Sequence, residues 1–420
     1  MFTGYNYEKV GFCNFIASFE MGILLIKQKL SGLWECLGNS MRIANVIEEG
    51  KLGGPQIRMV RIAAALSEQV ETIIIMPRSN SKLFTEMCLE YGVPYRLMRI
   101  TRITAEFREA VSYVVFTPLE VLALIRLFRR ERIEAVHASG GSWQYKGVIA
   151  AWMANIPVIW HLNDTDMPRW VRLLFRVFKP FADGFIIASH RTANYYGAKL
   201  DGNLCGVVPS TVDLEKFSPT NSYSSDDPVF EMLGKSPVVG TVANINFVKG
   251  FEILINAFAK ARQTVPNLRL VVVGPVHKNQ AGYFKKLCAI AERLDVAQAI
   301  EWVGGRTDVR PFLSRMDVYL CSSLSESSPV SVWEAMAMAL PIVSTDVGDV
   351  PLHVTHGKQG FVVPVGDSDA IAGHICDLIK DPAMRLRMGQ AAREAAIIFS
   401  PPIIAKMTLN IYQRVIQSRG

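Results

Sequence analysis

Residues 317–349 read DVYLCSSLSESSPVSVWEAMAMALPIVSTDVGD, and this stretch decides the fold. Its first five residues, Asp317–Cys321, predict a short buried strand that ends in small polar residues. Pro329 disfavours the helical conformation in the residue before it and itself suits the first position of a helix. We therefore expect a helix from Ser328–Pro329 to about Ala339, followed by another strand. Strand, helix and strand in this order are typical of a parallel α/β sheet.

Two glutamates belong to this helix and to the loop before it. We expect Glu326 in the loop and Glu334 on the second helical turn, so that eight positions, about 12 Å of helix, separate them. The N–H groups at the helix start, around Ser328, Pro329 and Val330, favour an anion between the carboxylates together with the helix dipole. This arrangement suits a nucleotide sugar, with one carboxylate on the ribose, N–H groups on the diphosphate and the other carboxylate on a second sugar. The alternative is that both glutamates are solvated surface charges, as most exposed glutamates are.

The run ESSPVSVWE (326–334), continued by AMAMALP and the turn TDVG (345–348), resembles the Glu-x7-Glu signature of the retaining glycosyltransferases of family 4. The resemblance spans roughly Met41 to the C terminus. It implies the fold of that family, which is α/β with two facing Rossmann-like doubly wound domains and an interdomain cleft (the GT-B type). It also implies that Glu334 holds the donor ribose, and that Glu326 contacts the transferred sugar and stabilises the positive charge developing there.

Four positions depart from the family pattern. Ser327 and Ser328 follow Glu326 where the family usually has a glycine and an apolar residue. Ala339 replaces a frequent glycine, and Leu352 stands where a glutamate often follows the glycine turn. Both signature carboxylates are kept, so these departures leave room for an altered choice of donor or a weaker activity.

Length and patterning predict two domains. A chain of 420 residues is too long for one ordinary core. Strand and helix patterns alternate on both sides of a segment rich in Ser, Asp and Pro, which reads as a linker. We expect an extension (1–40), a first Rossmann-like domain that binds the acceptor (41–219), a linker (220–236), a second Rossmann-like domain that binds the nucleotide sugar (237–400) and a last helix that returns to the first domain (401–420). The roles of the domains and the return of the last helix are what the resemblance implies.

The expected strands are Met41–Ile47, Glu71–Met76, Ala135–His137, Pro157–Trp160, Gly184–Ala188 and Cys205–Val208 in the first domain, and Val238–Val242, Leu268–Val273, Ile300–Val303, Val318–Cys321 and Ile342–Ser344 in the second.

Two other apolar stretches need separate interpretation. Phe15–Ile26 is interrupted by Glu20; it is too short and too charged for a membrane-spanning helix, and it makes a poor signal peptide. Residues 1–40 are either the product of an upstream start site or an added amphipathic helix, and the sequence leaves both open. The run Ala110–Ile125 contains Pro118 and a glutamate, and predicts a buried helix.

Two loops supply further candidates for binding the donor phosphates. Gly53 and Gly54 form a glycine-rich turn whose N–H groups can approach phosphate, although an ordinary tight turn explains them as well. Lys249 precedes a helix, where its ammonium can neutralise charge on a leaving diphosphate. The run VANINFVKG (242–250) resembles the family's basic loop, in which an arginine commonly precedes the lysine. Asparagines stand in that place here, so we assign Lys249 as the cation and Asn244 as a further donor-binding residue.

Histidines and acids at strand ends are the last candidates. His161 follows the apolar run PVIW, where it can hydrogen-bond a donor-sugar hydroxyl or an approaching acceptor, or be a structural histidine tied to a backbone carbonyl. The resemblance favours the functional role, because a cleft histidine commonly ends this strand in the family. His137 is a second candidate. Asp164, Thr165 and Asp166 spell the D-x-D pattern with which another class of glycosyltransferases binds a metal, but the surrounding sequence does not resemble that class, so we expect no metal.

Composition indicates where the protein works. The chain has a net charge of +7 and a pI of about 9.0, but carries no nucleic-acid-binding motif. Seven scattered cysteines without CxxC or Cys/His pairs indicate a reducing compartment and no zinc site. The segment Met167–Phe181 (MPRWVRLLFRVFKPF) places basic residues on one helical face and Trp170, Leu174, Val177 and Phe181 on another. Such a helix suits a membrane surface, and an ordinary helix with a solvated basic face fits the pattern equally well.

These features together predict a cytoplasmic enzyme, associated with the inner face of the membrane. We expect a retaining glycosyltransferase that moves a hexose from a nucleoside-diphosphate sugar, UDP-sugar before GDP-mannose, to a hydroxyl of a saccharide or a lipid-linked acceptor, in the synthesis of a cell-surface polysaccharide or glycolipid. The donor is a substrate, and no cofactor is expected. The resemblance implies a front-face displacement in which the leaving diphosphate oxygen deprotonates the acceptor. A nucleotide-sugar epimerase on a similar fold and a non-catalytic nucleotide-sugar-binding relative are the alternatives.

Overall fold

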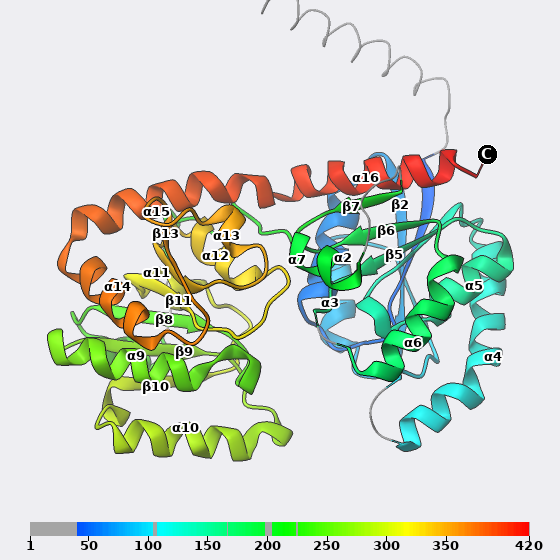
Figure 1. Ribbon diagram of the computed structural model, residues 1–420. Coiled ribbons are helices and arrows are strands. Elements are labelled where there is room, and N and C mark those ends of the chain that lie inside the picture. Colours follow the sequence, from blue (N-terminus) through cyan, green and yellow to red (C-terminus); the bar gives the residue numbers. More distant parts are fainter. Residues whose placement is uncertain (1–39, 104–106, 166, 198–203, 224–225, 420) are drawn as a thin grey trace, which may run out of the picture. The chain divides into compact units, whose positions relative to one another are not determined.

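The structure is a computed structural model that describes residues 40–103, 107–165, 167–197, 204–223 and 226–419 (Figure 1). The expected extension, up to residue 39, and Asp166 of the D-x-D run lie outside the described residues.

Seven parallel strands form the sheet of the first lobe, in the order β3-β2-β1-β4-β5-β6-β7. The strands are β1 (Met41–Val46), β2 (Val70–Pro77), β3 (Tyr95–Met98), β4 (Ala135–Ala138), β5 (Val158–Leu162), β6 (Gly184–Ile187) and β7 (Cys205–Val207). The helices are α2 (Gly54–Ala65), α3 (Lys82–Glu90), α4 (Phe107–Arg130), α5 (Lys146–Ala154), α6 (Arg169–Phe178) and α7 (His190–Tyr196), with 3-10 turns at Gly141–Trp143 and Lys179–Phe181. Apolar clusters cover this sheet on both faces.

Six parallel strands form the sheet of the second lobe, in the order β10-β9-β8-β11-β12-β13. The strands are β8 (Val238–Val242), β9 (Arg269–Val273), β10 (Ile300–Gly304), β11 (Val318–Cys321), β12 (Ile342–Thr345) and β13 (Gly360–Val363). The helices are α8 (Val229–Leu233), α9 (Phe251–Thr264), α10 (Ala281–Arg293), α11 (Arg310–Arg315), α12 (Val330–Ala337), α13 (Val350–His353), α14 (Ser368–Lys380), α15 (Pro382–Ala396) and α16 (Pro401–Gln417), with 3-10 turns at Phe247–Lys249, Lys278–Gln280, Ala297–Ala299 and Ile397–Phe399. Two doubly wound parallel sheets confirm the predicted fold class.

The strand order of each sheet reverses once, and these points locate the site. In the first sheet the chain builds outward from β1 through β2 to β3, then returns to place β4 on the other side of β1. The second sheet does the same around β8, with β11 as the returning strand. In open α/β sheets, ligands bind outside the carboxyl ends of the strands at such a reversal. The loops that follow β1, β4, β8 and β11 are therefore the places where binding residues are expected.

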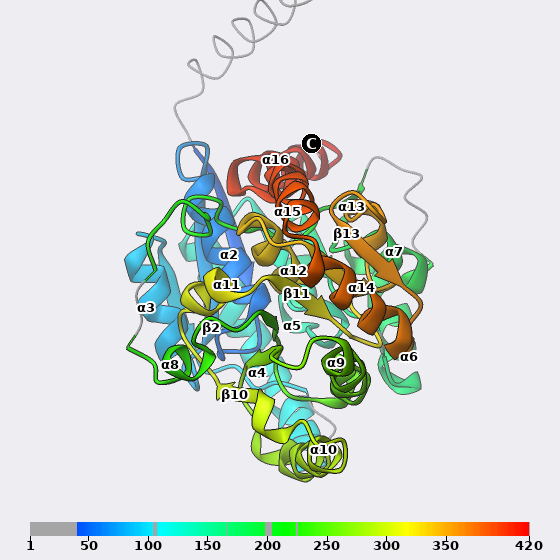
Figure 2. The same ribbon diagram turned by 90° about the vertical axis from the view of Figure 1, so that its left-hand side faces the viewer.

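The last helix of the chain leaves the second lobe and packs on the first. In Figure 1, α15 lies beside the second sheet and α16, in red, lies over the first; Figure 2 views the two helices nearly end-on. Helix α16 contacts α2, β5 and β6. The side chains of Ile411 and Val415 approach Gly206 and Gly184 so closely that a Cβ on either glycine would lie 2.6 Å or less from them. These two glycines therefore allow α16 to pack closely against the sheet.

The helix that carries the signature is shorter than expected. Helix α12 starts at Val330, one residue after Pro329, because Pro329 has an extended backbone (ψ 96°) and serves as the N-cap. The helix ends at Ala337, because Ala339 turns into the left-handed region with φ of +57°. The expected bounds, Ser328–Pro329 to Ala339, were wrong by one or two residues at each end.

Two other segments differ in detail from what the sequence predicted. The segment 220–236, expected to be a linker, contains α8, and Val229 and Leu233 of this helix are buried in the core of the second lobe. The run Ala110–Ile125 is helical, but it is not buried throughout. Within α4, Val114 is 71% exposed and Leu119 is 66% exposed, because only the opposite side of the helix faces the first lobe.

The amphipathic helix at Met167–Phe181 turns some of its apolar side chains to the core and others to solvent. In α6, Val171 and Phe175 face the core. Trp170, Leu173 and Val177 are exposed together with the arginines of the same helix. The predicted apolar face, which included Trp170 and Val177, is therefore partly open to solvent.

Candidate functional site

A cavity of about 500 Å³ lies where the reversal points of the two sheets come together. Ser139 and Gly140 follow β4, Asn246 follows β8, and Ser325 follows β11. The other lining residues are Gly54, Pro55, Arg58, His161, Asn163, Asp164, Thr165, Ala188, Ser210, Val248, Lys249, Glu326, Ser327, Ser328 and Val330. Both lobes therefore contribute strand-end loops to one polar cavity.

Besides His137, the sequence put forward ten candidate site residues, and the cavity gathers six of them. These are Gly54, His161, Lys249, Glu326, Ser328 and Val330. Four others do not line it. Gly53 is the N-cap of α2 and lies just outside, Pro329 caps α12, Asn244 lies two residues after β8, and Glu334 is further along α12.

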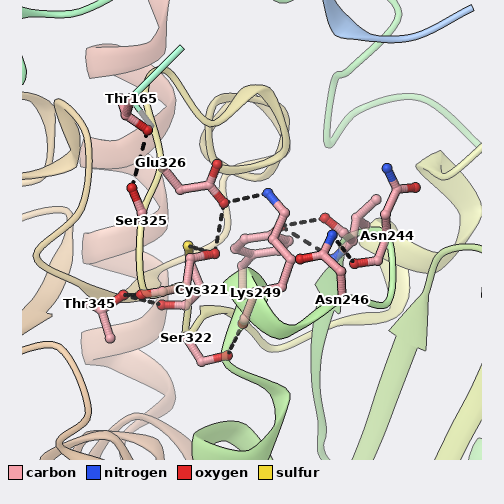
Figure 3. A network of polar contacts seen from close by, with 12 residues as sticks. Thr165, Asn244, Asn246, Lys249, Cys321, Ser322, Ser325, Glu326 and Thr345 are labelled. Atoms are coloured by element: carbon pink, nitrogen blue, oxygen red, sulfur yellow. Dashed lines mark hydrogen bonds and ion pairs between the residues drawn. The ribbon is translucent and has the colours of Figure 1, made fainter. Parts of the chain in front are cut away.

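Glu326 and Lys249 form an ion pair at the centre of the site (Figure 3). Lys249 Nζ lies 2.5 Å from Glu326 Oε1, and Ser323 Oγ donates to the same oxygen at 2.7 Å. Glu326 Oε2 has no hydrogen-bond partner among the residues described here. The pair therefore holds one carboxylate oxygen and leaves the other for a ligand in the cavity.

Local backbone contacts fix this pair. Ser322 Oγ donates to the carbonyl of Lys249 at 2.9 Å, and Thr345 Oγ1 donates to the carbonyl of Ser323 at 2.6 Å. Gly250 follows Lys249 with φ of +64°, and a Cβ at this position would lie 2.0 Å from the carbonyl oxygen of Ser322. Only glycine fits this turn, which explains why lysine and glycine occur together here.

The second carboxylate of the signature pair belongs to Glu334, on α12. Its side chain has no hydrogen-bond partner within the described part of the chain, and burial raises the pKa of Glu334 to about 7, while the positive charge of Arg61 opposes that rise. The first N–H groups of α12, near Val330, have no partner within the helix. The carboxylate of Glu334 lies one helical turn beyond these N–H groups. A ligand whose anionic part binds at the helix start could therefore donate hydrogen bonds from its hydroxyl groups to Glu334.

His161 is part of a buried polar cluster. Its Nδ1 lies 3.2 Å from Arg58 Nη1 and 3.3 Å from His137 Nε2. His137 does not line the cavity; its Nδ1 lies 2.7 Å from the hydroxyl of Tyr412 on α16. Burial lowers the pKa of His137 to about 3, and burial together with the positive charge of Arg58 lowers the pKa of His161 well below its ordinary value. Both rings are neutral at pH 7.

Two buried amides and a buried acid complete the wall of the cavity. Asn163 Oδ1 and Asn246 Oδ1 are buried without a hydrogen-bond partner in the described ranges. Asp164 Oδ2 accepts hydrogen bonds from the backbone and hydroxyl of Ser142, at 2.7 and 2.9 Å, and from Tyr196 at 3.1 Å. Burial raises the pKa of Asp164 against these bonds. Buried acceptors without partners are costly, and a hydroxyl-rich ligand would satisfy them.

The signature loop is tied to the first lobe by direct hydrogen bonds. Thr192 Oγ1 lies 2.7 Å from Ser327 Oγ, and Ser328 Oγ accepts a hydrogen bond from the backbone of Ser210 at 3.1 Å. Asp349 accepts from the backbone N–H of His190 at 2.8 Å and lies 3.0 Å from its Nδ1. The serines that depart from the family pattern thus make contacts that a glycine and an apolar residue cannot make.

Sequence reasoning missed Arg58 and Arg61. Both lie on α2, in the run PQIRMVRIAAA; Arg58 is buried, and Arg61 is half-buried and donates to the carbonyl of Thr211 at 3.4 Å. The sequence shows only that these two basic residues lie on a helix with few other polar groups. Which side of α2 faces the cavity depends on how the helix packs against the sheet and α16, and the local sequence does not determine that packing. Asn163 was missed because it follows His161 in an irregular loop.

Comparison with known proteins identifies the two lobes. Residues 52–216 match the family described as Glycosyltransferase Family 4, and residues 225–395 match Glycosyl transferases group 1. The chain is 23% identical to the N,N'-diacetylbacillosaminyl-diphospho-undecaprenol alpha-1,3-N-acetylgalactosaminyltransferase of Campylobacter jejuni over 380 residues, which cover 86% of this chain and 96% of that protein. It is 30% identical to the alpha-maltose-1-phosphate synthase of Mycobacterium tuberculosis over 229 residues, which cover 51% of this chain and 58% of that protein.

A solved structure supports the same assignment of the fold. HepE of Anabaena, in complex with UDP and glucose, matches with a TM-score of 0.75 at 20% identity, over 89% of this chain and 99% of that one. The two family matches together span most of the sequence, and each coincides with one lobe. The chain therefore belongs to the glycosyltransferases of family 4, with the group 1 domain as its second lobe.

Proposed function

We propose that the protein is a retaining hexosyltransferase that moves a sugar from a nucleoside diphosphate to a hydroxyl of a saccharide or a lipid-linked acceptor. The observation that carries the proposal is the pair of carboxylates on either side of the start of α12. Among the residues that the structure describes, Glu326 Oε2 has no partner at the cavity and the carboxylate of Glu334 has none beyond the helix start. Lys249 lies beside Glu326.

The donor occupies the second lobe in this proposal. Its ribose hydroxyls donate to Glu334, its diphosphate lies against Lys249 and the first N–H groups of α12, and the transferred sugar lies near Glu326. A structure of HepE was solved with UDP and another with UDP-glucose, which favours a UDP-sugar here over GDP-mannose. Asn244 lies two residues after β8 and does not line this cavity, and its backbone carbonyl accepts a hydrogen bond from the side chain of Asn246 at 3.4 Å, so we give Asn244 a supporting part in the loop rather than a direct contact.

The chemistry follows from the placement of these charges. The bond between the anomeric carbon and the diphosphate oxygen breaks, and positive charge develops on the sugar, where the negative Glu326 stabilises it. Lys249 and the helix N–H groups stabilise the negative charge that collects on the leaving diphosphate. The acceptor oxygen bonds to the anomeric carbon on the same face, and its proton passes to the leaving phosphate oxygen. The products are the glycoside with unchanged anomeric configuration and the nucleoside diphosphate.

We propose that this reaction needs no metal ion, because Lys249 and Arg58 supply positive charge to the cavity. In the described ranges, no group of three or more His, Cys, Asp or Glu residues is arranged to hold one. Donor binding and transfer should be unchanged by EDTA. Loss of activity that Mg²⁺ or Mn²⁺ restores would contradict this part of the proposal.

Calorimetry with UDP-, GDP- and ADP-sugars tests the donor site. We expect one donor to bind wild-type protein, and Glu334→Ala to weaken its binding by about 10-fold or more, since a hydrogen bond to a charged group is worth about 1.5–3 kcal/mol. Glu292→Ala, on α10, is a matched control that should bind like wild type. If no donor binds, or if both variants behave alike, the proposal fails. Binding without release of nucleoside diphosphate over a panel of acceptors would favour the non-catalytic alternative, and turnover of the donor without an acceptor would favour an epimerase.

We further propose that the first lobe contacts the cytoplasmic face of a membrane, where a lipid-linked acceptor would be found. The Campylobacter relative is named for a substrate linked to undecaprenol. Helix α6 exposes Trp170, Leu173 and Val177 beside its arginines, and α4 exposes a row of apolar side chains that includes Val114 and Leu119. Such a mixture of apolar and basic groups suits an anionic lipid surface.

Two helical stretches of the described residues, Arg108–Arg130 and Pro382–Gln417, are long and apolar enough to cross a membrane by length and composition alone. The second consists of α15, α16 and the turn between them; Phe399 and Ile404 are among its buried apolar side chains, whereas Leu386 is 64% exposed. Sedimentation with vesicles tests surface contact instead. Wild-type protein should bind vesicles containing anionic lipid, and Arg169→Glu with Arg172→Glu should abolish binding, whereas Lys285→Glu with Lys286→Glu on α10 should not. Equal binding by both double variants would refute the assignment of this surface.

A further inference from the structure

Five buried side chains form one hydrogen-bonded chain behind the cavity. Arg58 comes from α2, His137 from β4, His161 from β5, and Thr408 and Tyr412 from α16. Arg58 Nη1 lies 3.2 Å from His161 Nδ1, and Arg58 Nη2 donates to Thr408 Oγ1 at 3.4 Å. His137 Nε2 lies 3.3 Å from the same His161 Nδ1, with the two ring planes within 18° of each other. The hydroxyl of Tyr412 lies 2.7 Å from His137 Nδ1.

Only one placement of protons satisfies these contacts. A guanidinium has donors and no acceptor, so Nδ1 of His161 must accept the hydrogen bond from Arg58 and cannot carry a proton. The proton of the neutral His161 ring is therefore on Nε2. Because His161 Nδ1 is an acceptor, His137 must donate to it from Nε2. This leaves Nδ1 of His137 as an acceptor for the Tyr412 hydroxyl, and every contact then joins a donor to an acceptor, with the lone pair of His161 Nδ1 shared by Arg58 and His137.

The charge around the ring reinforces this state. In the described ranges, the titratable groups that contact the His161 ring are Arg58 and His137, with Tyr412 behind His137, and none of these is a carboxylate that would stabilise an imidazolium. Burial and the charge of Arg58 lower the pKa of His161 well below its ordinary value. Burial lowers the pKa of Arg58 to about 10, so the guanidinium stays charged at pH 7.

We propose that Arg58 and His137 hold His161 as a neutral ring with its proton on Nε2, so that His161 donates a hydrogen bond from Nε2 to an oxygen of the bound sugar. Nδ1 is occupied by Arg58 and His137, and Nε2 has no partner among the described residues, while the ring lines the cavity. Arg58 is a positioning residue for this contact. The inference rests on the proposed function for the identity of the ligand, but the protonation pattern itself does not.

This assignment decides which step His161 can perform. A ring with Nδ1 engaged and Nε2 protonated has no free lone pair toward the cavity, so it cannot remove the proton of the acceptor hydroxyl. It can hold a hydroxyl oxygen of the transferred sugar in place. The proton of the acceptor must then leave by another route, and the leaving diphosphate is the group that the displacement supplies. Thr408 and Tyr412 extend the role of α16, because they orient Arg58 and His137 from the opposite side of the cluster.

Nuclear magnetic resonance of the imidazole nitrogens tests the inference on the full chain. The protein has seven histidines, and a His161→Gln variant identifies the signals of His161 by their loss. In wild-type protein we expect the pattern of a neutral ring protonated on Nε2, unchanged from about pH 5 to 8, where an ordinary histidine titrates. A ring protonated on Nδ1, or one that titrates near the ordinary pKa of about 6.5, would overturn the inference.

Variants of Arg58 separate positioning from general stability. Arg58→Met should release Nδ1 and give His161 either mixed protonation patterns or a titration within that pH range, whereas Arg58→Lys, which keeps a donor, should retain the wild-type pattern. Arg96→Met, on the edge strand β3, is the matched control, because Arg96 pairs with Glu131 on the surface. It should leave the signals of His161 unchanged. An Arg58→Met protein that is folded and keeps the wild-type pattern would show that Arg58 does not set the proton position.

Kinetics then test the contact with the sugar. His161→Gln, whose amide can donate, should keep kcat/KM within about 3-fold of wild type, whereas His161→Leu leaves the sugar hydroxyl without its donor and should lose about 5- to 150-fold, since a buried polar group without a partner costs about 1–3 kcal/mol. Equal losses in the two variants would refute donation. If calorimetry finds no nucleotide-sugar binding while the protonation pattern is as expected, the proposed function fails and the role of Arg58 stands. If a donor binds but the ring is protonated on Nδ1, only this inference fails.

Discussion

Replacing Glu326 with glutamine should strengthen the binding of a nucleoside diphosphate while it abolishes transfer. Lys249 Nζ lies 2.5 Å from Glu326 Oε1, so the carboxylate neutralises the cation that the diphosphate needs. Glutamine has nearly the same size and keeps an oxygen that can accept from Ser323 and Lys249, but it has no charge. The change therefore removes the competitor for the ammonium without opening the site.

The size of the effect follows from the charge that the change removes. An ion pair between partly exposed side chains contributes up to about 1 kcal/mol, so Glu326→Gln frees roughly 1 kcal/mol of interaction for the diphosphate. This corresponds to a Kd for UDP that is about 5-fold lower. Lys249→Met removes the cation and should raise the Kd about 10- to 150-fold. Transfer should fall by about 10²-fold or more in both variants, because each loses a charge that acts on the transition state.

Calorimetry with UDP on both single variants and on the double variant measures these changes. Glu301→Gln is a matched control: Glu301 is paired with Arg269, and its side chain is 14% exposed, as is that of Glu326. It should change neither binding nor transfer. If Glu326→Gln weakens UDP binding as much as Lys249→Met does, Glu326 does not compete for the ammonium, and our reading of the pair is refuted.

Three further predictions concern stability. Burial raises the pKa of Glu334 to about 7, so the folded state binds this proton more tightly than the unfolded state, and stability should fall as pH rises from about 4.5 to 7. In urea unfolding, Glu334→Gln should reduce the change in unfolding free energy over this pH range by roughly 1–3 kcal/mol. This is less than the full equivalent of the pKa shift, because the carboxylate is partly open to solvent. An unchanged pH profile would contradict the raised pKa. Ala339→Gly should stabilise the protein by about 0.5–1 kcal/mol, because Ala339 has φ of +57°; a lower midpoint in urea would refute this. Gly250→Ala should destabilise by more than Gly92→Ala, since both glycines have left-handed φ but only a Cβ at Gly250 meets a backbone oxygen, at 2.0 Å; equal losses would show that this contact relaxes.

The elements with strong local signals were predictable from sequence. Strand β8 has the expected bounds, Val238–Val242, because a buried parallel strand is a short continuous apolar run. Strands β3 and β13 were missed. Tyr95–Met98 lies at the edge of its sheet with no fully buried residue, and Gly360–Val363 begins with a glycine and is only half buried, so neither has the apolar run that marks a central strand.

Some residues of the candidate site were likewise predictable from sequence, and others were not. Glu326 and Lys249 could be put forward as candidates because a loop, a proline and a helix start form a local pattern, and the structure brings the two side chains into contact. Arg58 could not be found, because its role depends on contacts with His161 and Thr408, which are 103 and 350 residues away in the chain. The exposed side of α4 was also unpredictable, since an apolar helix gives no sign of which of its faces lacks a neighbouring layer.

The seating of α16 on the first lobe has a consequence for the order of synthesis. The first sheet ends at Val207, but α16 begins only at Pro401. At about 5–20 residues per second, roughly 10 to 40 s of translation separate these two points. During that interval Thr408 and Tyr412 have not yet been synthesised. His137 and Arg58 therefore lack these hydrogen-bond partners until translation reaches α16. A first lobe produced without α16 would fold without these two hydrogen bonds to the cluster around His161.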